Sequence, residues 1–275
     1  MENQQIAIIG TGSMGEAILS GLVKAGIKPG NIRVTTKTSE TSTALSSKYQ
    51  VNARNLHDEN AANALAVEGA DVVILAVKPN LILETLGAIS SNLKSGSMVI
   101  SVAAGITTSA MEKLVETSVA VVRAMPNTPS VLGLGLTGIS RGSRVSEEQL
   151  DQAEKLFETV GKVIVVPEDR IDALSTISGS GPAYVFYFAE KLIAAAIKLG
   201  FTQQEAELMV KETFLGSSTL LADSNLSAQE LRSQVSSPNG TTMQATAVFD
   251  QANLEKIFSE ATQAALARAI ELGRI

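Results

Sequence analysis

Short apolar runs alternate with amphipathic segments through the first 166 residues. The apolar runs are continuous, which is typical of strands covered on both faces of a sheet. The expected strands are 6–9, 32–35, 51–53, 71–77, 98–102, 119–122, 134–139 and 162–166. Helical patterns fall between them at 13–25, 39–48, a stretch ending at Gly69, 79–93 and 147–159. This alternation implies right-handed crossovers and predicts an α/β fold with a Rossmann-type doubly wound parallel sheet.

After Pro167 the pattern becomes helical, and no strand is expected up to Ile275. The helix expected over 183–199 is apolar on nearly every face, so it needs cover from more than one neighbour. It is either the centre of a monomeric bundle or, the interpretation we favour, a face covered by the partner subunit of a homodimer. The predicted domains are 1–166, a dinucleotide-binding Rossmann domain, and 167–275, an all-α substrate-binding and dimerisation domain.

Composition narrows the classes of chemistry. The chain has no cysteine and one histidine, so disulfides, thiolate nucleophiles and a metal site are not expected. That histidine, His57, lies in a polar segment and is expected at the surface. The net charge of −6 argues against nucleic-acid binding. The start, Met1-Glu2-Asn3-Gln4-Gln5, lacks a signal-peptide pattern, and no apolar run reaches the roughly 18 residues of a membrane span, which predicts a cytoplasmic protein.

A glycine motif follows the first expected strand directly and opens the first expected helix. It reads Gly10-Thr11-Gly12-Ser13-Met14-Gly15 and matches G-x-G-x-x-G. Gly10 permits a tight turn, Gly12 lets the backbone approach a pyrophosphate, and Gly15 allows close helix–strand packing. The helix start adds free N–H groups and its positive dipole end. This context predicts a dinucleotide site.

The end of the second strand bears on the choice of cofactor. An NAD site usually carries an acidic residue there to hold the ribose hydroxyls. This chain has Thr35-Thr36-Lys37-Thr38-Ser39, and no acid occurs before Glu40. Hydroxyls and a lysine suit a phosphate, so we expect NADPH, with NADH as an accepted alternative. The competing interpretation is that Lys37 is only a solvated turn residue.

Six motifs then occur in a fixed order along the chain. They are the glycine motif, Ala76-Val77-Lys78-Pro79, Val102-Ala103-Ala104-Gly105, Arg123-Ala124-Met125-Pro126-Asn127-Thr128-Pro129, Ser178-Gly179-Ser180-Gly181-Pro182-Ala183-Tyr184 and Val235-Ser236-Ser237-Pro238-Asn239-Gly240-Thr241-Thr242. This set resembles the pyrroline-5-carboxylate reductase family over nearly the whole chain. The resemblance implies reduction of the C=N bond of 1-pyrroline-5-carboxylate to L-proline with NAD(P)H, the final step of proline biosynthesis. It also implies a homodimer, alone or within a larger homo-oligomer, acting on a small-molecule substrate.

The resemblance also implies site residues. The implied cofactor contacts are Gly10, Thr11, Gly12, Ser13, Met14, Gly15, Thr36, Lys37, Thr38, Asn63, Ala76, Val77, Lys78, Pro79, Val102, Ala103 and Ala104. The implied substrate contacts are Ser237, Asn239, Gly240, Thr241 and Thr242, with the Thr242 hydroxyl toward the ring nitrogen as the catalytic group. Many members have Gly-Gly where this chain has Asn239-Gly240, but Asn tolerates a left-handed backbone.

Residue chemistry alone leaves alternatives open. Lys78 is either a general acid or a charged residue at the sheet edge, and the hydroxyls of 236–242 are either a carboxylate cradle at a helix start or ordinary N-caps. A β-hydroxyacid dehydrogenase would need a lysine base about one turn after Gly181, and none occurs before Lys191. A dinucleotide sensor without turnover, or a purely structural dimer module, is the rival from another class.

Overall fold

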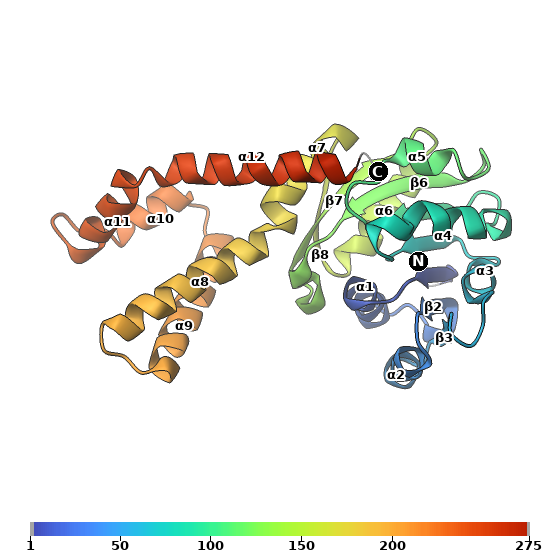
Figure 1. Ribbon diagram of the computed structural model, residues 1–275, viewed down its shortest axis with the longest axis horizontal. Helices are drawn as coiled ribbons and strands as arrows, with labels where there is room; N and C mark the ends of the chain where they lie inside the picture. The colour runs from blue at the N-terminus through green and yellow to red at the C-terminus, as the bar shows by residue number, and fades with distance from the viewer. Residues whose placement is uncertain (1–2, 274–275) are drawn as a thin grey trace. The chain divides into compact units, whose positions relative to one another are not determined.

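The computed structural model describes residues 3–273, and its contacts divide the chain into two compact units (Figure 1). The sheet unit comprises Met1–Ser180 with Ala265–Ile275, and the helical unit comprises Gly181–Ala264. The outermost residues of both predicted domains, 1–2 and 274–275, lie outside the described range. The first unit ends at Ser180, later in the sequence than the predicted boundary at 166/167, because the helix after Pro167 packs on the sheet.

The sheet unit contains one eight-stranded sheet in the order β3-β2-β1-β4-β5-β6-β7-β8. Its strands are β1 (Ile6–Ile9), β2 (Ile32–Thr36), β3 (Asn52–Asn55), β4 (Val72–Leu75), β5 (Met98–Ser101), β6 (Ala120–Met125), β7 (Gly135–Arg141) and β8 (Gly161–Val165). The chain crosses from β3 to β4, so the order reverses between β1 and β4. That switch point is where open α/β sheets bind their ligands.

One strand pair departs from the predicted parallel arrangement. The pair β6–β7 is antiparallel, while every other neighbouring pair is parallel. The link between these two strands is short and contains only the 3₁₀ helix η4 (Thr128–Leu132). A parallel return needs a crossover of a dozen or more residues, so the short link forces the chain to double back.

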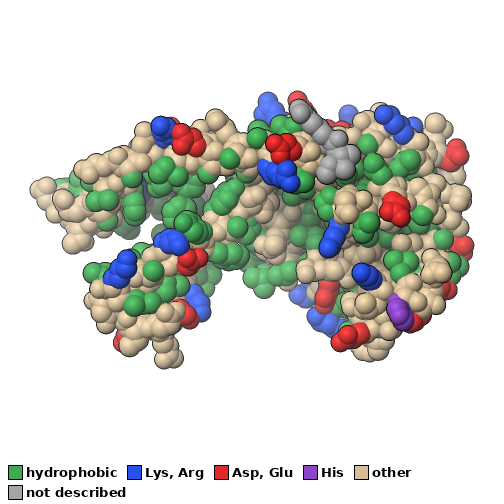
Figure 2. Space-filling model, in the orientation of Figure 1, with side chains coloured by type: hydrophobic (Ala, Val, Ile, Leu, Met, Phe, Trp, Pro, Cys, Tyr) green, Lys and Arg blue, Asp and Glu red, His purple; other side chains and the backbone are tan. Residues whose placement is uncertain are grey.

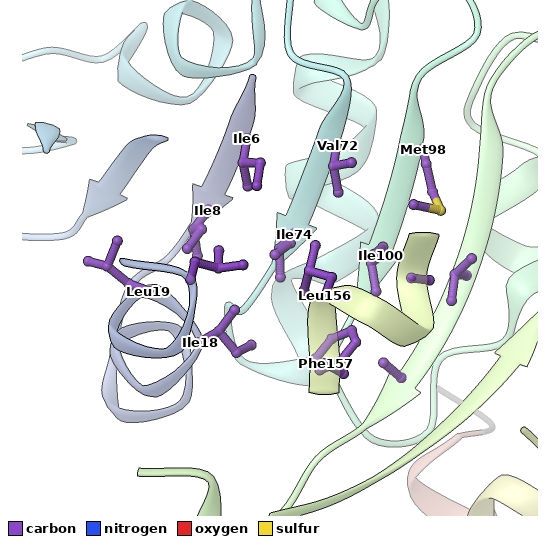
Figure 3. Packing of buried hydrophobic residues seen from close by; sticks show 14 of the residues in the cluster. Ile6, Ile8, Ile18, Leu19, Val72, Ile74, Met98, Ile100, Leu156 and Phe157 are labelled. Carbon is purple, nitrogen blue, oxygen red and sulfur yellow. The ribbon is translucent and has the colours of Figure 1, made fainter. Parts of the chain in front are cut away.

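Helices cover both faces of the sheet. They are α1 (Ser13–Lys24), α2 (Ser39–Tyr49), α3 (Ala62–Val67), α4 (Ile82–Ile89), α5 (Thr108–Glu112), α6 (Glu147–Glu158) and α7 (Glu168–Leu174), with the short 3₁₀ helices η1 (Pro29–Asn31), η2 (Pro79–Leu81) and η3 (Ser90–Asn92) and the π-helical turn η5 (Ser175–Gly179). Ile6 and Ile8 of β1 enter one hydrophobic core with Phe157 of α6 (Figure 3), and Ala7 and Ile9 enter the other. This alternation confirms the predicted doubly wound architecture.

The helical unit is built from α8 (Gly181–Lys198), α9 (Gln203–Asp223), α10 (Ala228–Gln234), α11 (Thr241–Gln251) and most of α12 (Leu254–Leu272). A capping box at Thr202 starts α9, and Phe188 of α8 stacks on Phe258 of α12 at 5.8 Å between ring centroids. As predicted, no strand follows Pro167 within residues 3–273.

Many large apolar side chains of the helical unit face solvent in the single chain. Phe186 of α8 is 67% exposed, and Leu215 of α9 is 64% exposed. Figure 2 shows such side chains along the visible surface of these helices. No helix within residues 3–273 is both long and apolar enough to span a membrane.

Candidate functional site

The glycine loop lies at the switch point, directly after β1. Gly10 has φ +81°, and a Cβ there would lie 2.3 Å from Cγ1 of Val77, just beyond β4. Both the backbone conformation and the available space therefore require glycine. The Thr11 amide donates to the Thr35 carbonyl at 2.7 Å, and the Gly10 amide donates to Oγ1 of Thr35 at 3.2 Å. These bonds fix the loop against β2.

The other two glycines of the motif have different surroundings. Gly12 is the N-cap of α1, and a Cβ built on it meets no atom within 4 Å. This side of the loop is therefore open, and the first-turn amides of α1 point toward it without intrahelical acceptors. Gly15 is closer packed, because its Cβ would touch that of Ala76 at 3.4 Å. The open side at Gly12 and the first-turn amides of α1 form a cradle suited to an anion such as pyrophosphate.

A groove of about 460 Å³ runs along the carboxyl ends of β1, β2, β3 and β4. This size is in the range of small-molecule sites. Six of the predicted cofactor residues line it: Gly10, Thr36, Lys37, Thr38, Asn63 and Val77. Five further lining residues were not predicted: Thr35, Leu56, His57, Leu81 and Thr85. Thr35, Leu56 and His57 lie at or directly after the carboxyl end of a strand, whereas Leu81 and Thr85 belong to the helical segments η2 and α4 that follow β4.

The turn after β2 forms one end of this groove. Oγ1 of Thr36 donates to the Thr38 carbonyl at 2.9 Å, and Oγ1 of Thr38 caps α2 by accepting from the Thr41 amide. These two hydroxyls therefore shape the turn. Lys37 is exposed and has no carboxylate partner among residues 3–273. None of the lining residues is acidic.

Asn63 provides a test of whether the groove fits a nucleotide. Its Oδ1 atom is buried and has no hydrogen-bond partner within the described chain. An unpaired buried carbonyl is costly unless a ligand or water supplies a donor. A ribose hydroxyl in the groove would supply that donor. The open glycine cradle, the acid-free turn and this unpaired oxygen together fit a bound dinucleotide.

A second, more apolar hollow of about 390 Å³ lies beyond β4 and β5. Pro79, Asn80, Leu83, Ala104, Ile106 and Leu272 line it. Of the residues predicted for the nicotinamide side, it includes Pro79 and Ala104. Thr11, Gly12, Ser13, Met14, Gly15, Ala76, Lys78, Val102 and Ala103 line neither this hollow nor the groove. Lys78 is exposed at the start of η2, and both interpretations of it stay open.

The predicted substrate loop lies in the helical unit. Gly240 is the N-cap of α11, and no side chain caps this helix. The hydroxyls of the loop are therefore not N-caps, which was the competing interpretation. The Gly240 amide donates to the Ser237 carbonyl at 2.9 Å, and Asn239 has φ +60°. Asn239 thus adopts the left-handed backbone that the sequence predicted, and Thr242 is half-buried in the first turn.

One motif that the sequence left without a role, residues 123–129, stabilises the sheet unit internally. Arg123 is 2% exposed and donates to Oδ1 of Asp172 at 2.5 Å. Asn127 donates to the Ser178 carbonyl and accepts from the Leu136 amide. These contacts join β6 to α7, η5 and β7. No cluster of acidic or histidine side chains able to hold a metal occurs among residues 3–273.

Comparison with known proteins agrees with this geometry. Residues 5–105 match a family described as NADP oxidoreductase, coenzyme F420-dependent, and residues 168–272 match pyrroline-5-carboxylate reductase dimerisation. A pyrroline-5-carboxylate reductase of Corynebacterium melassecola is 40% identical, with 98% of each chain covered.

Solved structures agree over the same length. A pyrroline-5-carboxylate reductase from Coxiella burnetii is 38% identical with a TM-score of 0.90, covering 98% of each chain. The Plasmodium falciparum pyrroline carboxylate reductase, solved with NADP bound, is 27% identical with a TM-score of 0.86 and covers 99% of each chain. The chain therefore belongs to the pyrroline-5-carboxylate reductase family.

Proposed function

We infer that the protein reduces the C=N bond of 1-pyrroline-5-carboxylate to L-proline with NAD(P)H, the last step of proline biosynthesis. The observation that carries this inference is the 40% identity to a pyrroline-5-carboxylate reductase over 98% of the chain. In this reaction the groove of the sheet unit binds the nucleotide, and residues 237–242 of the helical unit bind the substrate.

Reduction of a protonated imine requires little acid–base catalysis by the protein. A protonated imine already has an electrophilic carbon, so the main task is to hold that carbon against the hydride donor. When bound, the dinucleotide supplies the hydride. The carbon accepts it, and the π electron pair of the C=N bond moves to the nitrogen, which keeps its proton. This fits a chain with one histidine and no cysteine.

The chain's own residues then have separate tasks. Gly12 and the first turn of α1 hold the pyrophosphate, and Asn63 accepts from a ribose hydroxyl. The amides at the start of α11 hold the substrate carboxylate, with Ser237, Asn239, Gly240 and Thr241 shaping that cradle. Thr242 is the catalytic residue that orients the ring nitrogen. Val102, Ala103 and Ala104 border the nicotinamide side.

Several finer points belong to the same proposal. Residues 1–166 bind the nucleotide, while 167–275 bind substrate and form a homodimer, alone or inside a larger homo-oligomer. NADPH is preferred over NADH, supported by Lys37, which has no carboxylate partner among residues 3–273, and by the absence of acidic residues from the groove lining in the turn between β2 and α2. The protein acts in the cytoplasm and engages neither nucleic acid nor membrane.

The test is oxidation of NADPH, followed by its absorbance, on addition of the cyclic imine. Saturable imine-dependent oxidation with proline as product is expected. Binding of NADPH without turnover would instead favour the sensor interpretation. Oxidation of a β-hydroxyacid by NADP⁺ would favour the dehydrogenase alternative, for which no lysine base follows Gly181 before Lys191.

A further inference from the structure

His57 lies at the rim of the nucleotide groove. β3 ends at Asn55, and the Leu56 amide then donates to the Thr36 carbonyl at 3.0 Å. This bond holds the turn after β3 beside the turn after β2. As a result His57 lines the same groove as Lys37 and Thr38. Its side chain is 77% exposed, as the sequence predicted, but its position is not that of an arbitrary surface residue.

A chain of hydrogen bonds orients the imidazole ring. Nδ1 of His57 lies 2.8 Å from Oδ1 of Asp58, and Oδ2 of Asp58 accepts from Nδ2 of Asn55 at 3.0 Å. Asn55 is buried and also donates to Oγ of the buried Ser42 on α2 at 3.2 Å. The hydrogen bonds from His57 and Asn55 hold the pKa of Asp58 below its ordinary value. Asp58 is therefore a fixed, ionised acceptor.

This arrangement determines what the other ring nitrogen can do. An ionised carboxylate only accepts, so Nδ1 must be the donor in the His57–Asp58 bond. Nε2 has no partner within residues 3–273. In a neutral ring with this tautomer Nε2 is an acceptor, and it becomes a donor only when the ring is protonated. An anion in the groove would be bound by that protonated form.

We propose that His57 is a specificity-determining residue for the phosphorylated dinucleotide, with its protonated ring donating from Nε2 to the adenosine 2′-phosphate beside Lys37. The proposal rests on the proposed function, because it takes the groove to be the NAD(P)H site. Lys37 alone is a flexible point charge. His57, held through Asp58 and Asn55, adds a directed donor that NADH, which lacks this phosphate, cannot use.

The charges around His57 are consistent with this role. In the segment that follows β3, Asp58 is hydrogen-bonded to His57 itself. Arg54 and Glu59 form an ion pair, with 2.7 Å between Nη1 and Oε2. The turn after β2 contributes the cation Lys37, and the opposite side of the groove contributes the uncharged Leu81 and Thr85. Imidazole changes charge between about pH 5 and 8. The proposed contact needs the protonated ring, so we expect a stronger preference for the phosphate near about pH 5 than near about pH 8.

The experiment uses the fact that the chain has one histidine, so its ring resonances need no assignment. The full protein is titrated with adenosine 2′,5′-bisphosphate and, as the matched ligand without the 2′-phosphate, with adenosine 5′-monophosphate. The His57 signals are followed by NMR across about pH 5 to 8. We expect the bisphosphate alone to raise the titration midpoint of the ring. An equal midpoint with both ligands would overturn the proposal.

Affinity provides the second measurement. His57→Gln keeps a polar side chain that cannot become cationic, and Asn60→Gln is an exposed control on the same segment. We expect His57→Gln to weaken bisphosphate binding about three- to fivefold near pH 6 and to leave it unchanged near pH 8, as for an exposed ion pair. Binding of the monophosphate should not change. The phosphate of the ligand titrates in the same way with the natural protein and with His57→Gln, so it cannot cause a difference between them. Equal affinities of the two proteins near pH 6 would also overturn the proposal.

These measurements need no turnover, so they separate this inference from the proposed function. If the ring responds to the bisphosphate but the imine is not reduced, the reductase assignment fails and the role of His57 stands. If the imine is reduced but the ring ignores the phosphate, only the role of His57 fails.

Discussion

The sheet unit and the helical unit differ most in how they bury apolar side chains. The sheet unit has a core on each face of its sheet, and many of its members are fully buried. Within the described part of the helical unit the buried hydrophobic residues are Ala196, Ala206 and Val210, whereas Phe186 is 67% exposed. Contiguous exposed apolar surface of this kind marks an interaction site. The sheet unit thus carries its own core, while the helical unit needs a partner to complete one.

The two units also differ in what they offer a ligand. The groove lined by Lys37, His57 and Asn63 lies in the sheet unit, and the start of α11 with Thr242 lies in the helical unit. Nucleotide choice and imine handling should therefore respond to different mutations. The differences between the units give four predictions, each of which changes a residue of one unit.

The largest expected effect is on the core of the sheet unit. Phe157 of α6 is fully buried, so Phe157→Ala should lower the free energy of unfolding by about 3–5 kcal/mol. Because this core belongs to a single chain, the loss should not depend on protein concentration. Urea unfolding at several concentrations measures both quantities. A loss below about 1 kcal/mol would mean that the sheet unit does not depend on its own core.

Thr242→Ala should give the next largest effect, on turnover. Loss of one positioned hydroxyl should reduce kcat for imine reduction about 100-fold, or roughly 2.7 kcal/mol, with little change in NADPH affinity. Thr246→Ala is the matched control, since Thr246 is also half-buried and lies one turn further along α11. Steady-state kinetics and NADPH binding are the measurements. Equal kinetics in the two variants would remove Thr242 from the site.

Phe186→Glu tests whether a second copy covers the helical unit. A buried phenylalanine contributes about 1.5–3 kcal/mol to an interface, and a buried unpaired carboxylate adds a desolvation cost. We expect the variant to dissociate at concentrations at which the natural chain is a dimer or larger, as measured by sedimentation. Lys198→Gln, at an exposed position on the same helix, lowers the net charge by the same one unit and is the control for charge. A natural chain that sediments as a monomer would contradict the dimer proposal.

The sequence predicted the central strands well because burial on both faces leaves continuous apolar runs in β1 and β4. It did not predict the antiparallel β7, because the direction of a strand depends on the length of the preceding link and leaves no apolar pattern. The pairing of Arg123 with Asp172 was missed for a related reason. These residues lie 49 positions apart and meet only through the order of the strands.

The site residues also differ in whether a local feature of the sequence could predict them. Gly10 and Asn239 were predictable because the backbone requires a left-handed residue at each position, and this requirement is local. His57 was expected only at the surface. Its place in the groove follows from the hydrogen bond between the Leu56 amide and the Thr36 carbonyl, which joins two separate strand ends. A histidine just beyond the carboxyl end of a strand was the signal available in the sequence.

The smallest expected effect is on the choice between NADPH and NADH. Lys37→Gln removes an exposed cation, so it should reduce kcat/KM for NADPH up to about fivefold and leave that for NADH unchanged. Lys28→Gln removes the same charge before β2, at the opposite edge of the sheet, and should change neither. The KM for the imine should stay constant, because the proposed substrate loop, residues 237–242, belongs to the other unit. Equal losses with both nucleotides would mean that Lys37 acts on folding rather than on the phosphate. A change in imine KM alone would mean that nucleotide choice and imine handling are not divided between the two units.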